Sequence, residues 1–357
     1  MAVILDSMSN PIDAKQEEIR ALYRGLEDIK KLRIATGNRL VAALNSSIGV
    51  GCGKPKDEVE DKELDKVLKT IESEYKRITD FYAENGTKVR ITDKKLANFD
   101  DGAEKHIQFI KTAVDYDLVD SYMNLLESEN KHSATLAKVV ETHPLWNKFF
   151  KDAKGCGINL AACCIATLNI FEARHASSFW RYAGIDVVKV LDADGNIVGE
   201  GRSTKHAKLT KRTVVDKKTG ETREVNSLGY NPELKSYLLG AWFTNSYMKG
   251  GLRSEKDKDG KVIKYYSVDG YKYIDAYIDY RARLEQRADI KDYSNDRKNK
   301  MAKRYAVKQF LRDLWVAWRE LEGLEVSEPY EVAKLGNKPH KYNEAHEEAY
   351  LRTRKKA

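Results

Sequence analysis

The sequence predicts a mainly helical fold with short β-hairpins inserted into it. Long stretches place apolar residues three and four positions apart, which is the spacing of an amphipathic helix. Breaks that contain glycine and proline separate these stretches, and turns rich in Asp and Gly separate short β-branched runs. At 357 residues the chain is long enough to form two or three structural units.

Residues 13–45 are predicted to form the first helix. Its apolar stripe consists of Ile19, Leu22, Leu26, Ile29 and Leu32. Basic residues lie elsewhere on its surface and gather in the run 30–39. Three glycines and a proline within residues 46–55 end the helix. We therefore assign residues 1–55 to an N-terminal basic helix.

Residues 56–142 are predicted to form a long helical arm with two apolar stripes. The first stripe, over residues 64–82, recurs at near-heptad spacing, and the second helix runs from about 102 to 141. The stripes consist of Leu64, Val67, Ile71, Tyr75, Ile78 and Tyr82, then Ile107, Ile110, Val114, Tyr122, Leu126, Leu136 and Val140. A polar connection lets the two helices pack antiparallel as a coiled coil, which is typical of dimerisation arms. Pro144 ends the arm because the residue before a proline avoids the helical region.

A glycine-rich turn marks the next module, residues 145–185. Lys154-Gly155-Cys156-Gly157 is followed at once by a small apolar run that includes Asn159, and then by Trp180-Arg181-Tyr182-Ala183-Gly184. Glycine tolerates a positive φ and leaves backbone N–H groups uncovered at a helix start, which suits the close approach of a phosphate. The alternative is a turn whose glycines serve helix packing alone.

Beyond Gly184 the chain alternates short hairpins with helices. Runs rich in valine and tyrosine flank Asp and Gly turns at 192–196, 216–220 and 257–261, which predicts three hairpins. Further helices are predicted over 233–247, 270–288 and 296–321. We assign residues 143–325 to a single domain and residues 326–357 to a C-terminal tail.

The last long helix, 296–321, carries two different faces. Its apolar side consists of Met301, Tyr305, Leu311, Leu314, Trp318 and Leu321. Its basic side consists of Arg297, Lys300, Arg304, Lys308 and Arg312, which step by three or four positions. A basic stripe at helical spacing is the footprint expected along a phosphate backbone. An ordinary solvated basic face is the alternative.

The positive charge is concentrated in one third of the chain. The net charge is +8, and residues 187–312 hold 28 Lys and Arg against 17 Asp and Glu. Residues 1–186 hold 27 against 29, and residues 313–357 hold 8 against 9. An excess confined in this way predicts a basic surface that faces a polyanion. Scattered lysine that serves solubility alone is the alternative.

Several classes of protein are not supported by the sequence. No apolar run reaches the length of a membrane span and no secretory leader is recognised, so we expect a cytoplasmic protein without a membrane partner. The cysteines form no CxxC pair, which favours buried, reduced thiols over a disulfide or a zinc site. The seven histidines show no paired ligand spacing, so no metal is expected.

The sequence contains no catalytic constellation that we recognise. Asp6 alone does not make the carboxylate cluster of a metal-dependent nuclease, and the phosphate-cradling GxxxxGK[ST] motif and the GxSxG motif are not found. We therefore expect a protein that is not an enzyme. Ser203 lies in the basic, glycine-rich stretch 199–205 and is the one candidate nucleophile. A serine that contacts phosphate, or nothing, is the alternative.

The order of five motifs resembles a known family. The run 32–40, Gly155-Cys156-Gly157, Trp180-Arg181-Tyr182, the run 229–235 and the run 308–315 occur in that sequence along the chain. Together they resemble the Tas proteins of TIGR systems, which are RNA-guided DNA-targeting proteins of bacteria and phages. They also resemble the C-terminal region of bridge-RNA transposases. Both families are related to the Nop domain of box C/D ribonucleoproteins.

The resemblance implies a fold, a function and a set of partners. It implies a Nop-like helical body at 143–325 and a coiled-coil dimerisation arm at 56–142, hence a homodimer. It implies a guide RNA as the functional ligand, double-stranded DNA as the target, and a bacterial or phage-infected cytoplasm, associated with the nucleoid, as the location. Some family members carry a RuvC-like or HNH nuclease that is not recognised here, so the chain is similar to the nuclease-less type.

The resulting site hypothesis combines four groups of residues. On the first helix, the residues that would face RNA are Arg33, Asn38 and Arg39. In the glycine-rich turn, backbone N–H groups would face RNA phosphates at Lys154, Gly155, Gly157 and Asn159. Exposed nucleotides would be clamped or stacked on by Trp180, Arg181 and Tyr182. The heteroduplex backbone would be held by Lys205, His206, Lys208, Lys211 and Arg212, together with the stripe Arg297, Lys300, Arg304, Lys308 and Arg312. Trp180 and Tyr182 as core residues are the alternative. Two other functions stay open: a diverged transposase or recombinase that uses Ser203, and a sequence-independent helix-hairpin-helix DNA-binding or structural protein.

Overall fold

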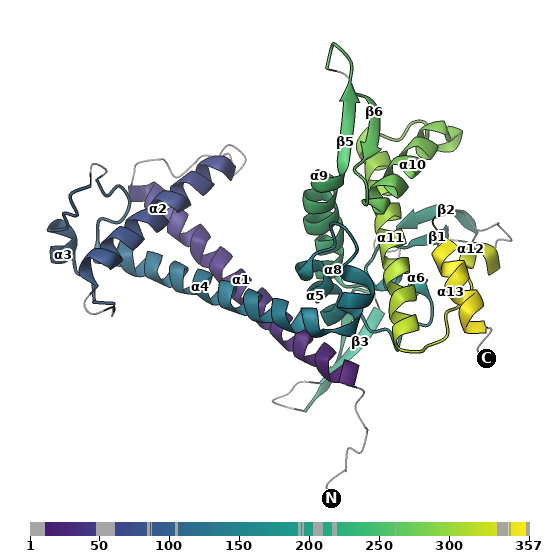
Figure 1. The fold of residues 1–357 in the computed structure, drawn as a ribbon, viewed down its shortest axis with the longest axis horizontal. Helices are drawn as coiled ribbons and strands as arrows, with labels where there is room; N and C mark the ends of the chain where they lie inside the picture. Colours follow the sequence, from purple (N-terminus) through teal and green to yellow (C-terminus); the bar gives the residue numbers. More distant parts are fainter. Residues whose placement is uncertain are drawn as a thin grey trace, which may run out of the picture. The chain divides into compact units, whose positions relative to one another are not determined.

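The computed structural model of the chain is mainly helical, as the sequence predicts (Figure 1). The chain forms two compact units: unit 1 comprises residues 1–20 and 137–357, and unit 2 comprises residues 21–136. The structure describes residues 11–47, 61–83, 86, 88–103, 106–191, 194, 196–202, 210–215, 220–260, 262–333, 342 and 344–354.

Unit 2 consists of helices and the segment that joins them. Its elements are the greater part of α1 (Pro11–Ser47), α2 (Asp61–Tyr82), α3 (Asp93–Ala97) and most of α4 (Ala113–Thr142). The two predicted arm helices are therefore present, but α4 begins at Ala113 instead of near residue 102. The reason is a reciprocal cap: the Thr112 N–H donates to Asp115 Oδ2 at 2.9 Å, and the Asp115 N–H donates to Thr112 Oγ1 at 3.1 Å.

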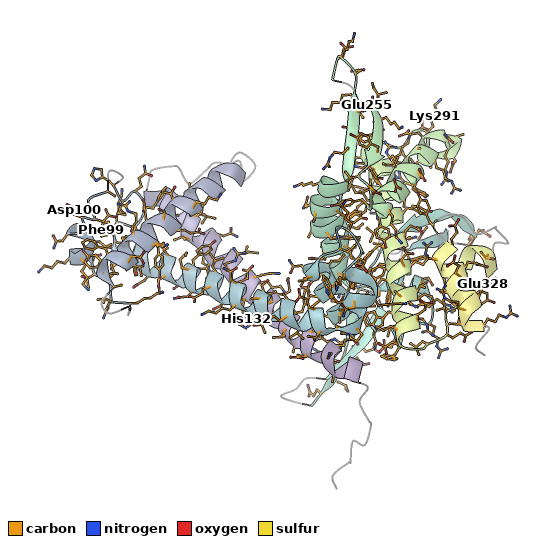
Figure 2. The ribbon with its side chains drawn as sticks, viewed as in Figure 1. Phe99, Asp100, His132, Glu255, Lys291 and Glu328 are labelled. Atoms are coloured by element: carbon orange, nitrogen blue, oxygen red, sulfur yellow. The ribbon has the colours of Figure 1, made fainter. Side chains whose placement is uncertain are left out.

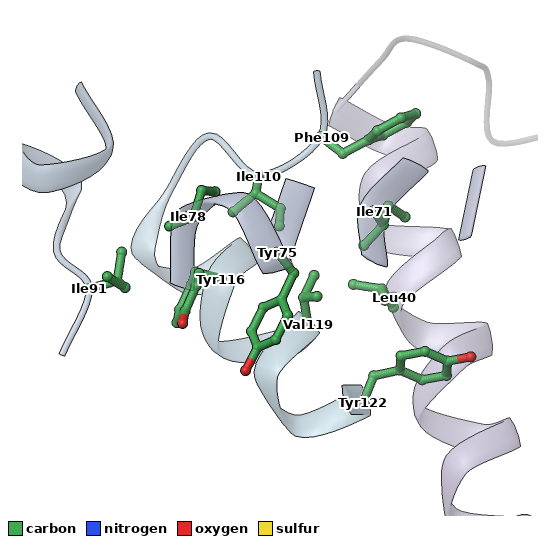
Figure 3. Close-up of a cluster of buried hydrophobic side chains, with 10 residues drawn as sticks. All are labelled: Leu40, Ile71, Tyr75, Ile78, Ile91, Phe109, Ile110, Tyr116, Val119 and Tyr122. Atoms are coloured by element: carbon green, nitrogen blue, oxygen red, sulfur yellow. The ribbon is translucent and has the colours of Figure 1, made fainter. Parts of the chain in front are cut away.

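The core of unit 2 is a cluster of aromatic and branched side chains (Figure 3). It consists of Leu40, Ile71, Tyr75, Ile78, Ile91, Phe109, Ile110, Tyr116, Val119 and Tyr122. Three of these side chains, on α2, belong to the stripe that the sequence predicts. A Cβ atom at Gly37 would lie 3.2 Å from Tyr122 Cε2, so the glycine lets α1 and α4 approach closely.

A buried carboxylate anchors the segment that leads into α4. Glu74 is 3% exposed and accepts from the backbone N–H groups of Gln108, Phe109 and Ile110 at 2.7, 2.9 and 3.2 Å. Backbone N–H groups removed from water must find acceptors, and a charged acceptor makes a strong bond. The Glu74 carboxylate therefore holds in place three residues whose backbone N–H groups have no partner within a helix or a strand.

Unit 1 contains the remaining helices. They are η2 (Trp146–Phe150), α5 (Ile158–Thr167), α6 (Ala176–Tyr182), α8 (Pro232–Ser236), η3 (Tyr237–Tyr247), α9 (Met248–Gly251), α10 (Lys272–Gln286), η4 (Ala288–Ile290), α11 (Asn295–Leu321), α12 (Tyr330–Ala333) and α13 (Glu344–Arg354). The predicted helix 233–247 is thus an α-helix continued by the π-helix η3. In η3 the Thr244 hydroxyl donates to the carbonyl of Leu239, five residues earlier, at 2.6 Å. The region assigned to a C-terminal tail includes α13, which packs against α11.

Three two-stranded antiparallel sheets complete unit 1, and they confirm the predicted hairpins. β1 (Val187–Leu191) pairs with β2 (Ile197–Arg202), β3 (Thr210–Val215) with β4 (Thr222–Ser227), and β5 (Leu252–Lys256) with β6 (Val262–Ser267). The β5–β6 ribbon extends beyond the helices of this unit, and Figure 2 labels Glu255 on it. Such isolated ribbons are insertions on a helical body, not a shared sheet.

The first turns of α1 close the end of the buried helix α5. Gln16 donates to the carbonyls of Ile165 and Leu168 at 2.9 and 2.8 Å, and Arg20 Nε donates to the carbonyl of Ala166 at 2.9 Å. The last carbonyls of a helix have no partner within that helix, so side chains must supply the donors when the end is buried. This explains why the start of α1 belongs to unit 1.

Helix α11 is the central element of unit 1. It packs against α6, α10, α13, η2 and η3, and Phe310, Trp315 and Trp318 on it are fully buried. Each buried indole N–H has an acceptor: Trp315 Nε1 donates to the Ala173 carbonyl at 2.7 Å and Trp318 Nε1 to Glu322 Oε1 at 3.1 Å. A helix surrounded in this way is buried over most of its length and exposes little beyond its first turns.

Candidate nucleic-acid interface

Gly155 in the glycine-rich turn is required by packing. Its φ is +76°, a conformation that side-chain-bearing residues rarely adopt. A Cβ atom there would lie 2.7 Å from a Tyr247 ring carbon and 2.8 Å from a Tyr271 ring carbon. The Gly155 carbonyl also accepts from Trp242 Nε1 at 3.0 Å. These contacts account for this glycine without any ligand, which supports the packing alternative at this position.

The other turn residues differ in their surroundings. Lys154 Nζ donates to the Asp269 carbonyl at 3.0 Å and lies 5.5 Å from the centroid of the Tyr271 ring. Gly157 is the N-cap of α5 with φ −75° and ψ −179°, which any residue adopts, and a Cβ there would meet no atom within 4 Å. Asn159 is exposed in the first turn of α5. Gly157 and Asn159 therefore border open space, whereas Lys154 and Gly155 contact other parts of the protein although both are exposed to solvent.

Helix α6 presents the predicted Trp-Arg-Tyr motif in three environments. Trp180 is half-buried; its Nε1 donates to the Lys308 carbonyl at 3.0 Å, and Lys308 Nζ lies 5.2 Å from its ring centroid. Trp180 is thus tied to α11, in agreement with the core alternative. Arg181 is exposed, and Tyr182 is 43% exposed. Arg181 and Tyr182 are the members of the motif that a ligand can reach.

The start of α8 adds residues that the sequence-based site hypothesis missed. Asn231 caps α8 by accepting from the Leu234 N–H at 3.0 Å, and its own N–H donates to the Tyr182 carbonyl at 2.7 Å. Tyr230 therefore lies beside α6, and Lys235 Nζ lies 5.0 Å from its ring centroid. In the sequence, Asn231-Pro232 indicates the start of this helix. Tyr230 and Lys235 on either side of it are the signal that could have predicted a binding site here.

We define the α6–α8 surface as Trp180, Arg181, Tyr182, Tyr230, Lys235 and Lys308. Two of its aromatic rings carry a lysine within cation–π distance, and Arg181 and Tyr182 are exposed at the end of α6. Aromatic faces interleaved with cations are the composition that binds unpaired nucleotides, because the rings stack on bases while the cations contact phosphates.

The basic stripe of α11 is not one exposed face. Arg297 is exposed with its guanidinium carbon 3.4 Å from the Tyr293 ring centroid, and Lys300 is exposed and paired with Asp296 at 2.6 Å. Arg304 and Lys308 are half-buried. Arg312 is 4% exposed and pairs with Asp313 at 3.0 Å. The stripe enters the core because the second half of α11 is surrounded by other helices.

The remaining predicted site residues lie elsewhere. Arg33 forms an ion pair with Glu129 inside unit 2, and this hydrogen bond raises the pKa of the arginine. Asn38 and Arg39 are exposed on the part of α1 that belongs to unit 2. Lys211 and Arg212 lie on β3. Lys205, His206, Lys208 and the candidate nucleophile Ser203 lie outside the described residues.

Three features of the described residues bear on other kinds of site. No group of three or more His, Cys, Asp or Glu side chains in the described ranges is placed to hold a metal ion.

Cys156, Cys163 and Cys164 are buried and unbridged, and burial raises the pKa of the Cys156 thiol to about 12, which suppresses its thiolate. None of the described helices has both the length and the apolar character of a membrane span.

Comparison of the chain with protein-family models, curated proteins and solved structures finds no match. The resemblance to Tas proteins therefore rests on the order of the motifs in the sequence. The geometry of the α6–α8 surface is a separate observation that does not depend on that resemblance.

The two glycines of the turn are predicted to respond differently to alanine. Gly155→Ala should lower the free energy of unfolding by about 2–4 kcal/mol, because it combines an unfavourable positive φ with overpacking against Tyr247 and Tyr271. Gly157→Ala should cost less than about 1 kcal/mol, the effect of a poorer N-cap. Urea unfolding monitored by circular dichroism measures both. Equal losses for the two variants would contradict the packing role of Gly155.

Proposed function

We propose that this protein binds a guide RNA and, through base pairing of that RNA, binds double-stranded DNA without cutting it. The observation that carries the proposal is the α6–α8 surface, in which exposed and half-buried tyrosines alternate with cations. RNA offers unstacked bases far more often than duplex DNA does, so aromatic rings beside cations favour RNA as the direct ligand. The order of the family-like motifs supports the same function.

The distribution of charge between the two units supports the same proposal. Unit 1 holds 44 Lys and Arg against 34 Asp and Glu, whereas unit 2 holds 19 against 21. The unit that carries the α6–α8 surface thus carries the whole positive excess. A polyanion is attracted to such a unit over long distances, and this attraction depends on salt. Unit 2 has no such excess and suits a structural role.

A guide RNA explains how such a protein selects DNA. Phosphate and shape contacts hold a polynucleotide but carry little sequence information, whereas base pairing between guide and target does. We therefore assign no catalytic residue and no cofactor other than RNA. The site of action is the cytoplasm of a bacterial or phage-infected cell, at its DNA.

The first test identifies the nucleic acid that purifies with the protein. The full chain, purified without nuclease treatment, should carry a defined small RNA, and the loaded protein should bind matching duplex DNA and leave it intact in the presence of Mg²⁺. Sequencing of the bound fraction and a gel-shift assay measure these outcomes. Random DNA in place of RNA would favour the sequence-independent alternative, and strand joining or cleavage would favour the transposase alternative.

The salt dependence of RNA binding tests the α6–α8 surface itself. Arg181→Gln combined with Lys235→Gln should weaken binding. The slope of log affinity against log salt should flatten by about 0.7 for each single-strand phosphate that the variant no longer neutralises. The matched control is Arg283→Gln combined with Lys291→Gln, which removes two exposed charges elsewhere in unit 1; Figure 2 labels Lys291. An equal change of the slope in both double variants would show that the α6–α8 surface is not the RNA-binding site.

We further propose that unit 2 mediates homodimerisation. Leu32 and Ile34 on α1 are 58% and 53% exposed, and Val114 on α4 is 67% exposed. The packing of two helical arms against each other would bury apolar side chains that are exposed in one chain. Leu32→Glu combined with Ile34→Glu should convert the dimer to a monomer at micromolar concentration, as measured by light scattering after size exclusion. Ser73→Glu, at an exposed position of α2, is the control. A monomeric native protein would contradict the proposal.

A further inference from the structure

Unit 1 contains a polar pocket of about 280 Å³ that the α6–α8 surface does not include. Its walls come from one face of α10, one face of α11 and the region around α13. The lining residues are Lys272, Tyr273, Asp275, Asp279, Gln309, Arg312, Asp313, Tyr342 and Ala345. On α10 the polar members are spaced by three and four positions, and so are those on α11, so each set shares one helix face.

One end of the pocket carries positive charge. Asp313 accepts from Lys272 Nζ at 2.7 Å and from Arg312 Nη2 at 3.0 Å, so two cations meet one carboxylate. Tyr273, which is 3% exposed, donates its hydroxyl to Asp313 at 3.2 Å. Donors held in place by such a network are preorganised to face an acceptor on a ligand.

The walls also contain two further carboxylates, which are acceptors. Asp275 accepts from the Ser267 hydroxyl, and Asp279 accepts from the Tyr342 hydroxyl at 2.6 Å. Two carboxylates in the wall of one pocket disfavour a phosphate or another anion as the ligand. They favour a group that presents N–H donors.

Gln309 gives the strongest indication that the pocket binds a ligand. Its side chain is only 5% exposed, and its Oε1 has no hydrogen-bond partner in the described part of the chain. A buried amide oxygen without a donor is unfavourable, and such atoms are rare in folded proteins unless water, an ion or a ligand supplies the bond. Gln309 lines this pocket, and its Oε1 is covered by neighbouring atoms, so a rotation of the amide toward the pocket would bring this oxygen to a ligand N–H.

We infer that this pocket binds one unpaired guanine base of the RNA that the protein carries. Guanine presents N1–H and an exocyclic amino group side by side, and these donors match the carboxylates and Gln309. Its O6 and N7 acceptors lie along the adjoining edge and match Arg312 and Lys272, since basic side chains are the usual partners of these two atoms. Adenine and cytosine carry an amino group but lack the neighbouring N–H, and uracil lacks the amino group. The inference that the guanine belongs to an RNA rests on the proposed function. The inference that the pocket prefers guanine does not.

Free nucleosides test the pocket independently of any RNA. Saturation-transfer NMR with the full-length protein should show guanosine bound at a concentration at least about tenfold lower than adenosine, cytidine or uridine. Gln309→Leu and Asp275→Asn should each reduce guanosine binding about tenfold, while Asp292→Asn, at an exposed position outside the pocket, should leave it unchanged. Gln309→Leu should keep or raise the melting temperature, because it removes the buried oxygen that lacks a donor. Equal binding of all four nucleosides would overturn the inference.

A second arm distinguishes RNA from a free nucleoside as the source of guanine. The unpaired guanosines of the co-purified RNA are replaced by inosine one at a time, and only one of these replacements should weaken binding. The Gln309→Leu protein should bind that RNA and the unmodified RNA equally well. RNA binding that inosine and the pocket variants leave unchanged would overturn the RNA assignment. Guanosine binding by a protein that binds no RNA would refute the proposed function and establish a nucleoside site instead.

Discussion

The burial of α11 is the constraint on which unit 1 depends. Phe310, Trp315 and Trp318 have no exposed surface, and helices pack against α11 from several sides. Large aromatic side chains dominate the energetics of such a core, provided that each indole N–H finds an acceptor. The Trp180 N–H also bonds to a carbonyl of α11, so the motif-bearing helix α6 is positioned by the same core. The proposed nucleic-acid surface therefore depends on packing around one helix.

The same constraint divides the basic residues into two groups. Arg297 and Lys300 lie on the exposed first turns of α11, whereas Arg312 lies in the core, where it pairs with Asp313. A buried arginine must be paired, since an isolated buried charge is very unfavourable. Arg312 is thus withdrawn from the outer surface and placed in the wall of the pocket. Helical spacing alone does not distinguish these two situations.

Polar side chains that bond to backbone groups define the ends of the elements. Gln16 and Arg20 serve the last carbonyls of α5, and Glu74 serves three N–H groups ahead of α4. These residues appear in the sequence as ordinary polar positions on amphipathic helices. Their partners are 34 to 152 positions away in the chain, so no local pattern reveals them. The glycine-rich turn is similar: its motif is visible, but Tyr247 and Tyr271, which make Gly155 necessary, are distant in sequence.

Local periodicity, turn residues and composition are sufficient to predict the helical class, the long first helix, the arm helix α2, the three hairpins and the concentration of positive charge. Long-range packing, in contrast, sets which basic residues remain exposed and ties Trp180 to α11. It also brings Tyr230 and Lys235 beside Arg181 and Tyr182, and it places Gln309 in the lining of a pocket. The physical reason is that exposure and partnership are set by which helix faces meet. That choice follows from the packing of residues far apart in the chain, which repeats and spacings do not encode.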